Sequence, residues 1–497
     1  CDIGHRVADT MLASQLLDAG LPGAHAKGRH TLQALTKRVL GVELDKTEQA
    51  SDWSRELRQE QLRYAARDAA VLLPLARRLD QELEEAGLTR VVEIECRALP
   101  ALAWLEDTGV QIDRDRWLRL AERAWARKAE VEACLDNVIG SHTTAELGFE
   151  VERGVVDWNS RDTVLALLRE RGVELPNLKR DTLAEHVDDD PLVAVLLERS
   201  EWTGRTTVFG ERFLERVHPL TGRLHGDFKQ AFTASGRISC EKPNLQNIPR
   251  DLAYRACFRA PEGRLLVKCD YSQIELRIAA EIAQDERMMT AYREQADLHQ
   301  LTARTVLGKS EVSKADRQAG KATNFGLCYG MGPIRFRANA LANYGVEFTE
   351  KEARRFRATF FQTYRGLAAW HARYASQREA PIDTRTLAGR RRLSVINFSE
   401  KLNTPVQGTG ADGLKLAMGL LFETRDRVPS AKPVLNVHDE IVLECDERDA
   451  AEAEVWLGEV MRGGMQQLLR RVPVEVESSR GRDWSMREEA GDAEHVA

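Results

Sequence analysis

Two apolar stretches far apart in the chain each carry an aspartate at one end, and this pairing limits the folds that the sequence can form. Residues 264–270, RLLVKCD, are predicted to be a strand that ends at Asp270. Residues 434–445, VLNVHDEIVLEC, are predicted to be a hairpin whose apolar run is interrupted by the polar residues 438–440. Only tertiary structure could bring the two acidic segments together.

Paired carboxylates on neighbouring strands need a partner, because they repel each other unless they share a proton or a cation. Two Mg²⁺ ions could hold both Asp270 and Asp439, since hard cations take oxygen ligands. A two-ion site is typical of in-line phosphoryl displacement. The alternative is that each acid caps a turn or pairs with an arginine, and the two stretches alone favour that alternative.

A predicted helix at 317–330, RQAGKATNFGLCYG, carries two cations followed by two aromatic residues, each four positions apart: Arg317, Lys321, Phe325 and Tyr329. Four residues advance a helix by about 400°, so these side chains form one slowly drifting stripe. A nucleoside triphosphate offers matching partners, because cations stabilise phosphate charge and aromatic rings stack on bases. A helix with extended surface cations and a buried aromatic end would show the same pattern, so both interpretations remain open.

Two segments rich in turn residues carry amide and guanidinium side chains. These are Arg237, Gln246 and Asn247 in TASGRISCEKPNLQNIP (233–249), and Asn403 and Gln407 in NTPVQGTGAD (403–412). Such side chains can bind the acceptor atoms of a DNA minor groove. Turn formation and helix capping explain the same residues equally well.

The bulk properties exclude little. The net charge of −6 argues against a wholly basic nucleic-acid coat, but it leaves room for a local basic cleft. No apolar run reaches the roughly 18 residues that a membrane helix needs, so we expect no membrane partner. The chain opens CDIGHRVADT without an initiator methionine, and we expect it to be a fragment of a longer protein.

Together these strings resemble the family A DNA polymerases, the group of bacterial DNA polymerase I and its phage relatives. DYSQIELR (270–277) resembles their motif A, residues 317–330 their motif B and VHDE (437–440) their motif C, and the two turn-rich segments resemble their primer–template binding segments. Order and spacing agree over roughly residues 91–485. The resemblance implies a multidomain α/β and α+β fold shaped like a right hand, with an antiparallel palm sheet and helical fingers and thumb.

The resemblance implies roles at the nucleotide site. Asp270 and Asp439 would be metal ligands assisted by the Tyr271 carbonyl, with Glu440 as a supporting catalytic acid. The side chains that would contact the nucleotide are Arg317 and Lys321 at the triphosphate, Phe325 at the sugar, and Tyr329 and Glu275 at the 2′ position. Lys321 would also donate a proton to the leaving pyrophosphate.

The resemblance also implies a DNA-binding surface at the primer end, made by Arg237, Gln246, Asn247, Asn403, Gln407 and His438. One departure concerns a secondary contact: Ser399 stands where many family members carry an arginine.

The first 90 residues resemble the C-terminal part of the family's 3′–5′ exonuclease domain, which has an RNase H-like fold. DTMLASQLL (9–17) would make Asp9 a metal ligand, and YAARD (64–68) would supply Tyr64 and Asp68. No DxE sequence precedes Asp9. We therefore expect a truncated domain whose nuclease site is incomplete in this chain.

The implied activity is template-directed DNA synthesis, in replication or repair, with two Mg²⁺ ions that Mn²⁺ could replace. The implied partners are primer–template DNA and dNTPs, for a monomer in bacterial or phage-infected cytoplasm, associated with the nucleoid. A single-subunit RNA polymerase, a catalytically silent DNA-binding scaffold and a stand-alone nuclease are the alternatives. Glu275 argues against the RNA polymerase. The presence of Asp270, Lys321 and Asp439 together argues against the silent scaffold, and the 400 or so residues beyond a nuclease domain argue against a stand-alone nuclease.

We expect the partial exonuclease at 1–90, palm at 91–117, thumb at 118–235, palm at 236–284, fingers at 285–400, palm at 401–486 and a polar tail at 487–497. The patterns further predict helices at 31–41, 54–87 (broken at Pro74), 115–135, after 270, through most of 285–380 and at 447–470, short strands within 219–250, and strands at 264–270 and 472–478, with Ser160 capping a helix.

Overall fold

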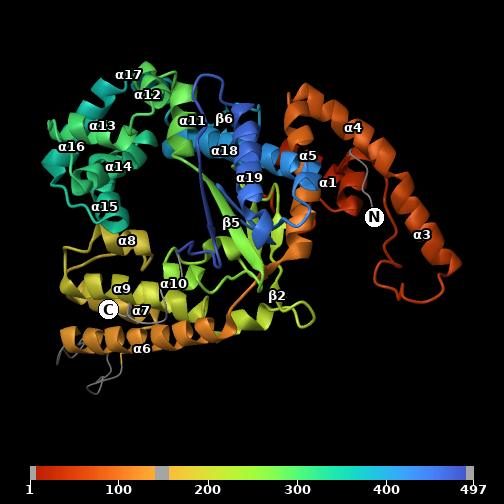
Figure 1. The fold of residues 1–497 in the computed structure, drawn as a ribbon, viewed down its shortest axis with the longest axis horizontal. Helices are drawn as coiled ribbons and strands as arrows, with labels where there is room; N and C mark the ends of the chain where they lie inside the picture. The colour runs from red at the N-terminus through yellow and green to blue at the C-terminus, as the bar shows by residue number, and fades with distance from the viewer. Residues whose placement is uncertain (1–6, 140–155, 488–497) are drawn as a thin grey trace.

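The computed structural model describes residues 7–139 and 156–487, so most of the predicted tail lies outside the described residues. A lobe at the N-terminus, on the right of Figure 1, consists of short helices. These are α1 (Thr10–Asp18), α2 (Leu32–Leu35), the π-helix η1 (Thr36–Leu40), α3 (Gln59–Ala70) and α4 (Leu72–Glu85). The break predicted at Pro74 lies at Val71 instead, because proline is tolerated in the first turn of α4.

The centre of the molecule is a four-stranded antiparallel sheet in the order β10-β5-β9-β8, which confirms the expected palm sheet. Its strands are β5 (Arg264–Tyr271), β8 (Lys432–Val437), β9 (Glu440–Asp446) and β10 (Val476–Gly481). The last strand begins later than predicted because side chains bind the backbone just before it: Arg277 donates to the Pro473 carbonyl and Gln466 accepts from Val474 N.

Two helices, α5 (Thr89–Thr108) and α19 (Ala450–Gln466), pack against this sheet, and α18 (Phe398–Glu423) packs against both helices. Every residue of β8 from Pro433 to Val437 is buried. Strands covered on both faces are apolar without alternation, which explains the continuous apolar run of the sequence.

Below the sheet in Figure 1 lies an arm of helices with a small core of its own, which includes Leu135, Val164 and Leu192. The arm contains α6 (Arg114–Ile139), α7 (Arg161–Glu170), α8 (Arg180–Glu185) and α9 (Pro191–Thr207). The Ser160 side chain accepts a hydrogen bond from Thr163 N, so the predicted cap of α7 is confirmed.

Above the sheet stands a helical lobe, as predicted for 285–380. It contains α11 (Ile274–Ala283), α12 (Glu286–Arg293), α13 (Leu298–Leu307), α14 (Lys314–Cys328), α15 (Pro333–Tyr344), α16 (Glu350–Thr363) and α17 (Arg365–Ala375). Arg337 of α15 forms a 2.5 Å ion pair with Asp188, which follows α8, so the upper lobe touches the lower arm.

Short elements complete the chain. They are β1 (Val110–Gln111) paired with β2 (Arg223–Leu224), β3 (Asp227–Lys229) with β4 (Ser239–Glu241), β6 (Ile382–Arg385) with β7 (Arg391–Val395), the helix α10 (Leu252–Arg255), and the 3₁₀ helices η3 (Glu211–Arg216), η4 (Leu245–Asn247), η5 (Arg425–Arg427) and η6 (Glu447–Asp449). The β6–β7 hairpin packs on α18 and reaches the N-terminal lobe, where Leu393 N donates to the Ala19 carbonyl.

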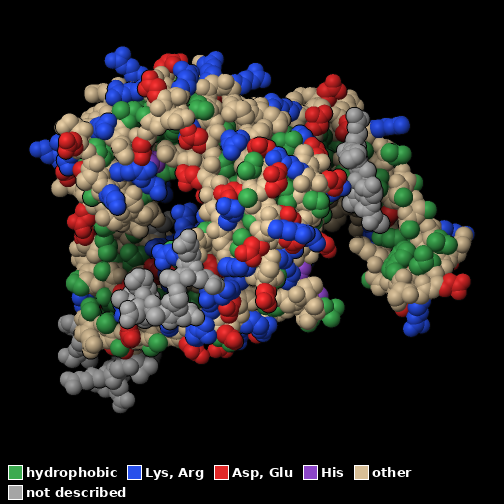
Figure 2. Space-filling model, viewed as in Figure 1, with side chains coloured by type: hydrophobic (Ala, Val, Ile, Leu, Met, Phe, Trp, Pro, Cys, Tyr) green, Lys and Arg blue, Asp and Glu red, His purple; other side chains and the backbone are tan. Residues whose placement is uncertain are grey.

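A cleft of about 1250 Å³ lies between the sheet, the upper lobe and the lower arm. Figure 2 shows the molecule hollowed between these parts. None of the described helices is both long enough and apolar enough to cross a membrane.

Candidate active site

The fold brings the two distant aspartates together at the floor of the cleft. Strands β5 and β9 pair so that Asp270 lies opposite Glu440, the first residue of β9. Asp439 immediately precedes this strand. Tyr271 N donates to the Asp439 carbonyl at 3.4 Å, and both Asp270 and Asp439 line the cleft. His438 has a φ of +58°, so the polar triplet begins in the turn of the hairpin, where an apolar strand can accommodate it.

The surroundings of Asp270 and Asp439 disfavour the charged form of both carboxylates. Burial raises the pKa of Asp270, and the charges of Asp439 and Glu440 raise it further. Burial also raises the pKa of Asp439, to which Glu275 and Glu440 contribute. Asp270 Oδ1 is buried without a hydrogen-bond partner. A bound cation would relieve both the repulsion and the missing partner.

The carboxylate oxygens of Asp270 and Asp439 suit a hard cation that takes its other ligands from outside the protein. Within residues 7–139 and 156–487, no group of three or more His, Cys, Asp or Glu side chains is arranged to hold a metal ion. Mg²⁺ is typically bound by one or two carboxylates together with substrate phosphates, which two aspartates facing a cleft allow. The Tyr271 hydroxyl donates to the Met461 carbonyl of α19, so only the main chain of Tyr271 could contribute.

Glu440, predicted to be a supporting acid, is held by side chains outside the cleft, and its catalytic role stays a prediction. Its carboxylate accepts a hydrogen bond from Trp484 Nε1 and lies 3.5 Å from Arg255, whose guanidinium stacks 4.4 Å from the Trp484 ring. Only 4% of Glu440 is exposed. Asp439 lines the cleft and Glu440 does not, because Trp484 and Arg255 engage the Glu440 carboxylate, although its charge still raises the pKa of Asp270.

The predicted stripe of cations and aromatic residues lies on α14, whose Arg317, Lys321 and Phe325 line the upper wall of the cleft. Arg317 Nε donates to Asp297 at 2.6 Å. Tyr329 lies one residue beyond the helix, and its hydroxyl donates to Glu275 at 2.6 Å. Arg317, Lys321 and Phe325 therefore face the cleft, whereas Tyr329 holds Glu275 through a hydrogen bond.

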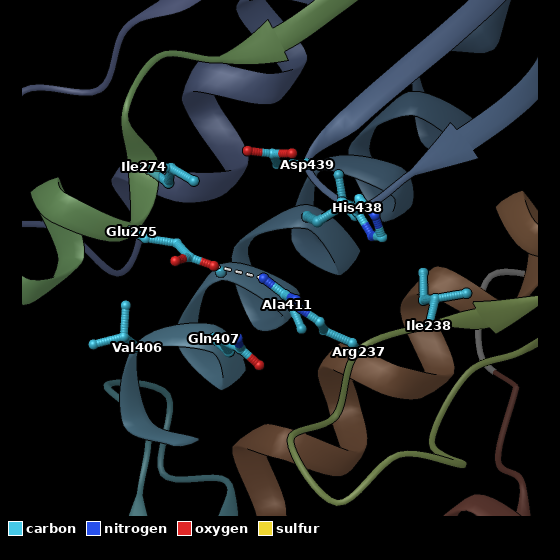
Figure 3. Close-up of a pocket in the computed structure, with 11 residues that line it drawn as sticks. Arg237, Ile238, Ile274, Glu275, Val406, Gln407, Ala411, His438 and Asp439 are labelled. Atoms are coloured by element: carbon cyan, nitrogen blue, oxygen red, sulfur yellow. Dashed lines mark hydrogen bonds and ion pairs between the residues drawn. The ribbon is translucent and has the colours of Figure 1, made fainter. Parts of the chain in front are cut away.

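A narrower pocket of about 40 Å³ adjoins the acidic floor. Figure 3 shows Arg237 reaching from its loop towards Glu275, with Gln407 on α18 below and His438 and Asp439 at the hairpin tip above. The Arg237 guanidinium donates to Glu275 at 2.6 Å. The structure thus gathers Arg237, Gln407 and His438 around one pocket, although they come from three separate segments.

The predicted DNA contacts of Gln246, Asn247 and Asn403 are not gathered there. Gln246 is 9% exposed and its amide donates to the Asn436 carbonyl of β8 at 3.3 Å, so in this structure it supports the sheet, and its contact with DNA stays a prediction. Asn247 is exposed, and Asn403 has a buried Oδ1 without a partner among the described residues. Neither asparagine is among the residues that line the cleft or the narrow pocket.

Two residues were missed from the sequence: His299, which lines the cleft wall, and Asp297, which holds Arg317 of that wall. Asp297 caps α13 by accepting from His299 N and Gln300 N, and it also holds Arg317. His299 lines the cleft, with its ring centroid 5.9 Å from that of Phe325. The capping aspartate in QADLHQ (295–300) was a usable signal for the start of α13, but nothing in the sequence places a lone histidine beside a helix that begins later in the chain.

The predicted exonuclease residues do not form one site in the structure. Tyr64 and Asp68 share a face of α3 as predicted, but Lys46 Nζ donates to the Tyr64 hydroxyl at 3.1 Å and to Asp68 at 2.7 Å. Asp9 caps α1 by accepting from Met11 N and Leu12 N. Figure 1 shows α1 beside α5 and α3 at the far end of the lobe.

Comparison with known families matches residues 167–486 to DNA polymerase family A and residues 5–84 to 3′–5′ exonucleases. DNA polymerase I of Aquifex aeolicus is 33% identical over 510 residues, covering 96% of this chain and 83% of the relative. DNA polymerase I of Pseudomonas aeruginosa is 32% identical over 96% of this chain and 53% of the relative. The thermostable DNA polymerase I of Thermus aquaticus is 34% identical over 81% of this chain and 49% of the relative. The chain therefore spans about half the length of the last two relatives.

A solved structure shares the architecture. The POL domain of Pol1 from M. smegmatis, in complex with DNA primer-template and dNTP, superposes with a TM-score of 0.76 at 25% identity, covering 96% of this chain and 82% of that one. Sequence and fold agree over the segments that build the cleft. Residues 5–84 match the 3′–5′ exonucleases, and the chain as a whole belongs to DNA polymerase family A.

Proposed function

We propose that this chain is a template-directed DNA polymerase that adds deoxynucleotides to a primer 3′ end. The observation that carries the proposal is the pairing of Asp270 with Asp439 on the floor of a cleft whose opposite wall presents Arg317 and Lys321. An acidic floor facing a basic wall fits a reaction in which cations and cationic side chains share the charge of a triphosphate.

The acidic floor would hold the divalent cations, Mg²⁺ or in its place Mn²⁺. When bound, they activate the primer 3′ oxygen and offset the charge that builds on the leaving pyrophosphate. Arg317 is held by Asp297, so its guanidinium is oriented before the nucleotide arrives. Lys321 has no ion-pair partner among the described residues and is free to bind the triphosphate and supply a proton to pyrophosphate.

Selection of deoxyribose would rest on the pair formed by Tyr329 and Glu275. Their 2.6 Å hydrogen bond fixes both side chains at the junction of α14 and α11. A fixed pair of bulky groups leaves no room for a 2′ hydroxyl, and this favours dNTPs over NTPs. The same pair argues against the RNA polymerase alternative.

The primer terminus would lie at the narrow pocket, where Arg237, Gln407 and His438 converge. These side chains offer donors to minor-groove acceptors, which are common to all base pairs. The solved relative in complex with DNA primer-template and dNTP supports DNA and dNTPs as the partners. We further propose that the lower arm is the thumb, the upper lobe the fingers and the sheet the palm, and that the protein works as a cytoplasmic monomer.

The decisive experiment is Mg²⁺-dependent extension of a labelled primer by the Asp439→Asn variant. We expect a loss of more than about 100-fold, since even outer partners of metal ligands typically cost about 10–100-fold. Affinity for duplex DNA, measured by fluorescence anisotropy, should stay within about threefold. Contacts with the phosphates hold the duplex in place, and a carboxylate such as Asp439 makes none of them. Near-normal extension by this variant would refute the assignment of Asp439.

A matched control lies at the other end of the same strand. Asp446→Asn changes an equally acidic side chain of β9 that pairs with Arg264, away from the cleft. It should extend primers at the wild-type rate. If the wild-type protein binds DNA but does not extend it with any dNTP, the polymerase proposal fails and a DNA-binding scaffold is favoured.

A further inference from the structure

A buried chain of hydrogen bonds crosses the upper lobe behind α14 and ends at His299. The Tyr364 hydroxyl lies 2.6 Å from Thr302 Oγ1, Thr302 Oγ1 donates to Asn324 Oδ1 at 2.8 Å, and Asn324 Nδ2 lies 2.9 Å from His299 Nδ1. All four residues are at most 2% exposed. Buried polar groups of this kind are costly unless every member has a partner.

The direction of each bond follows from the inventory of donors. Thr302 has a single hydroxyl hydrogen, which it gives to Asn324 Oδ1, so Tyr364 must donate to Thr302. Asn324 Nδ2 also lies 3.5 Å from the Leu298 carbonyl, which keeps the amide nitrogen, and not its oxygen, on that side. The amide can only donate, so His299 Nδ1 must be the acceptor.

An accepting Nδ1 fixes the state of the imidazole, whose proton is then on Nε2. Burial is the main cause that lowers the pKa of His299 to about 4, with Asp297 opposing the shift and the charges of Arg317 and Lys321 adding to it. The ring therefore stays neutral near pH 7. Among the described residues no protein group accepts from Nε2–H, and His299 lines the cleft beside Arg317, Lys321 and Phe325.

We propose that Asn324 is a positioning residue, which holds His299 as a neutral Nε2–H donor to a phosphate oxygen of the incoming nucleoside triphosphate. Thr302 and Tyr364 in turn orient Asn324. This inference rests on the proposed function, since it takes the triphosphate as the ligand of the basic wall. A neutral donor adds direction without adding a third positive charge beside Arg317 and Lys321, whose mutual repulsion already disfavours another cation.

The first test reads the tautomer directly. The protein has 11 histidines, and ¹⁵N-labelled histidine gives separate signals for protonated and unprotonated ring nitrogens. The His299 signals are identified by their loss in His299→Gln. We expect Nδ1 unprotonated and Nε2 protonated across pH 6–8 in the wild-type protein. A protonated Nδ1 at pH 7.5 would overturn the proposal whatever the variants do.

The second test reverses one donor. Asn324→Asp is nearly isosteric, but its carboxylate accepts from His299 Nδ1 and raises the pKa of the ring. We expect KM for dNTP to rise by about 5–10-fold, the equivalent of one lost hydrogen bond, and a new pH dependence of KM near neutrality. The groups facing the ring in that variant are the new carboxylate, Asp297, Arg317 and Lys321. An unchanged KM and pH profile would contradict the proposal.

Substitution of the histidine distinguishes positioning from general support. Glutamine can place its amide N–H near the position of Nε2–H, whereas asparagine mimics the other nitrogen, so His299→Gln should raise KM for dNTP less than His299→Asn does. In the His299→Gln background, Asn324→Asp should have little further effect on KM. Full additivity of the two changes would mean that Asn324 acts by another route.

The two proposals fail separately. Wild-type protein that extends primers but shows no effect of Asn324→Asp on KM refutes only the positioning role. Wild-type protein that does not extend primers at saturating dNTP refutes the polymerase assignment, and the tautomer measurement then still reports whether the hydrogen-bond chain exists. Tyr364→Phe removes the outermost hydroxyl and leaves Thr302 donating to Asn324, so it should change KM by less than about twofold.

Discussion

At the scale of single residues, the cleft shows how neighbouring side chains of one motif acquire different roles. His438 occupies the turn, Asp439 faces the cleft, and Glu440 is buried against Trp484. The turn at His438 and the partners that hold Glu440 account for this division. Glu440 instead supports the hairpin from behind, with Arg255 and Trp484 as its partners.

The carboxylate of Asp270 should cost stability when no cation is bound. A raised carboxyl pKa means that the folded state holds the proton more tightly than the unfolded state, so stability falls as pH rises from the usual aspartate range through the raised value. At pH 8 in EDTA we expect Asp270→Asn to melt about 2–4 °C higher than wild type. At pH 5 the difference should shrink, which calorimetry at the two pH values measures.

A variant of opposite sign provides the control. Asp316 accepts from Ser313 and from Lys309, and these bonds lower its pKa to about 2. Asp316→Asn should therefore lower the melting temperature at pH 8, where Asp270→Asn raises it. A lower melting temperature for Asp270→Asn in EDTA would mean that its carboxylate is not held against repulsion.

At the scale of elements, a buried ionic cluster joins α5, α18 and the β6–β7 hairpin. Glu95 accepts from Lys415 at 2.6 Å and from Arg390, and Arg390 also donates to Asp412 at 2.7 Å. Lys415 further donates to the Gly236 carbonyl at 2.7 Å, immediately before the loop residue Arg237. The cluster therefore fixes the loop that carries Arg237 into the narrow pocket.

Removal of one charge should unbalance this cluster. Two acids face two bases, so Lys415→Met leaves one buried negative charge without compensation. We expect the free energy of unfolding, measured by urea denaturation, to fall by about 3–5 kcal/mol. At temperatures where the variant is folded, primer-extension assays should give a raised apparent Kd for primer–template, because the loop that carries Arg237 is less well fixed.

An exposed ion pair gives the comparison. Arg354 pairs with Glu350 one turn away on α16, and both side chains are about half exposed or more. Arg354→Ala should cost about 0–1 kcal/mol. If Lys415→Met costs no more than this variant, the buried cluster does not stabilise the fold in the way that its geometry implies.

At the scale of the whole molecule, the cleft is enclosed by parts that the chain contributes from distant segments. The upper lobe and the lower arm meet through Arg337 and Asp188, an exposed pair that contributes little stability. The N-terminal lobe stands apart from the cleft. Exposed apolar side chains gather over its α3 end in Figure 2, and those of this region are Trp53, Leu57, Leu62, Leu72 and Leu73.

The N-terminal lobe should not degrade DNA in this chain. Lys46 neutralises Asp68, and Asp9 is engaged as a helix cap, so neither acid is free to hold a cation. We expect no Mg²⁺-dependent 3′–5′ shortening of labelled single-stranded DNA above the background of an Asp68→Ala variant. Shortening by the wild-type chain that disappears in Asp68→Ala would show that Asp68 binds metal despite Lys46.

Much of the fold and of the site could be predicted from local patterns. The strand at 264–270, the hairpin with its polar tip, and the helix at 317–330 follow from apolar periodicity and turn residues, which act over a few positions. The boundaries differed where a side chain from elsewhere competes for the backbone, as Arg277 does at Pro473. Gln246 could not be placed from its loop, because its burial depends on β8, which lies far along the chain.

The sequence by itself determined the chemistry that this protein can offer: two aspartates at the ends of apolar strands, and a helix with cations spaced by one turn. Tertiary structure alone decided which of these groups meet. Pairing of β5 with β9 joins Asp270 to Asp439, packing of α13 on α14 gives His299 its partner in Asn324, and Trp484 withdraws Glu440 from the cleft. The physical reason is that contacts between distant segments depend on how whole elements pack, and no local pattern in the sequence encodes that packing.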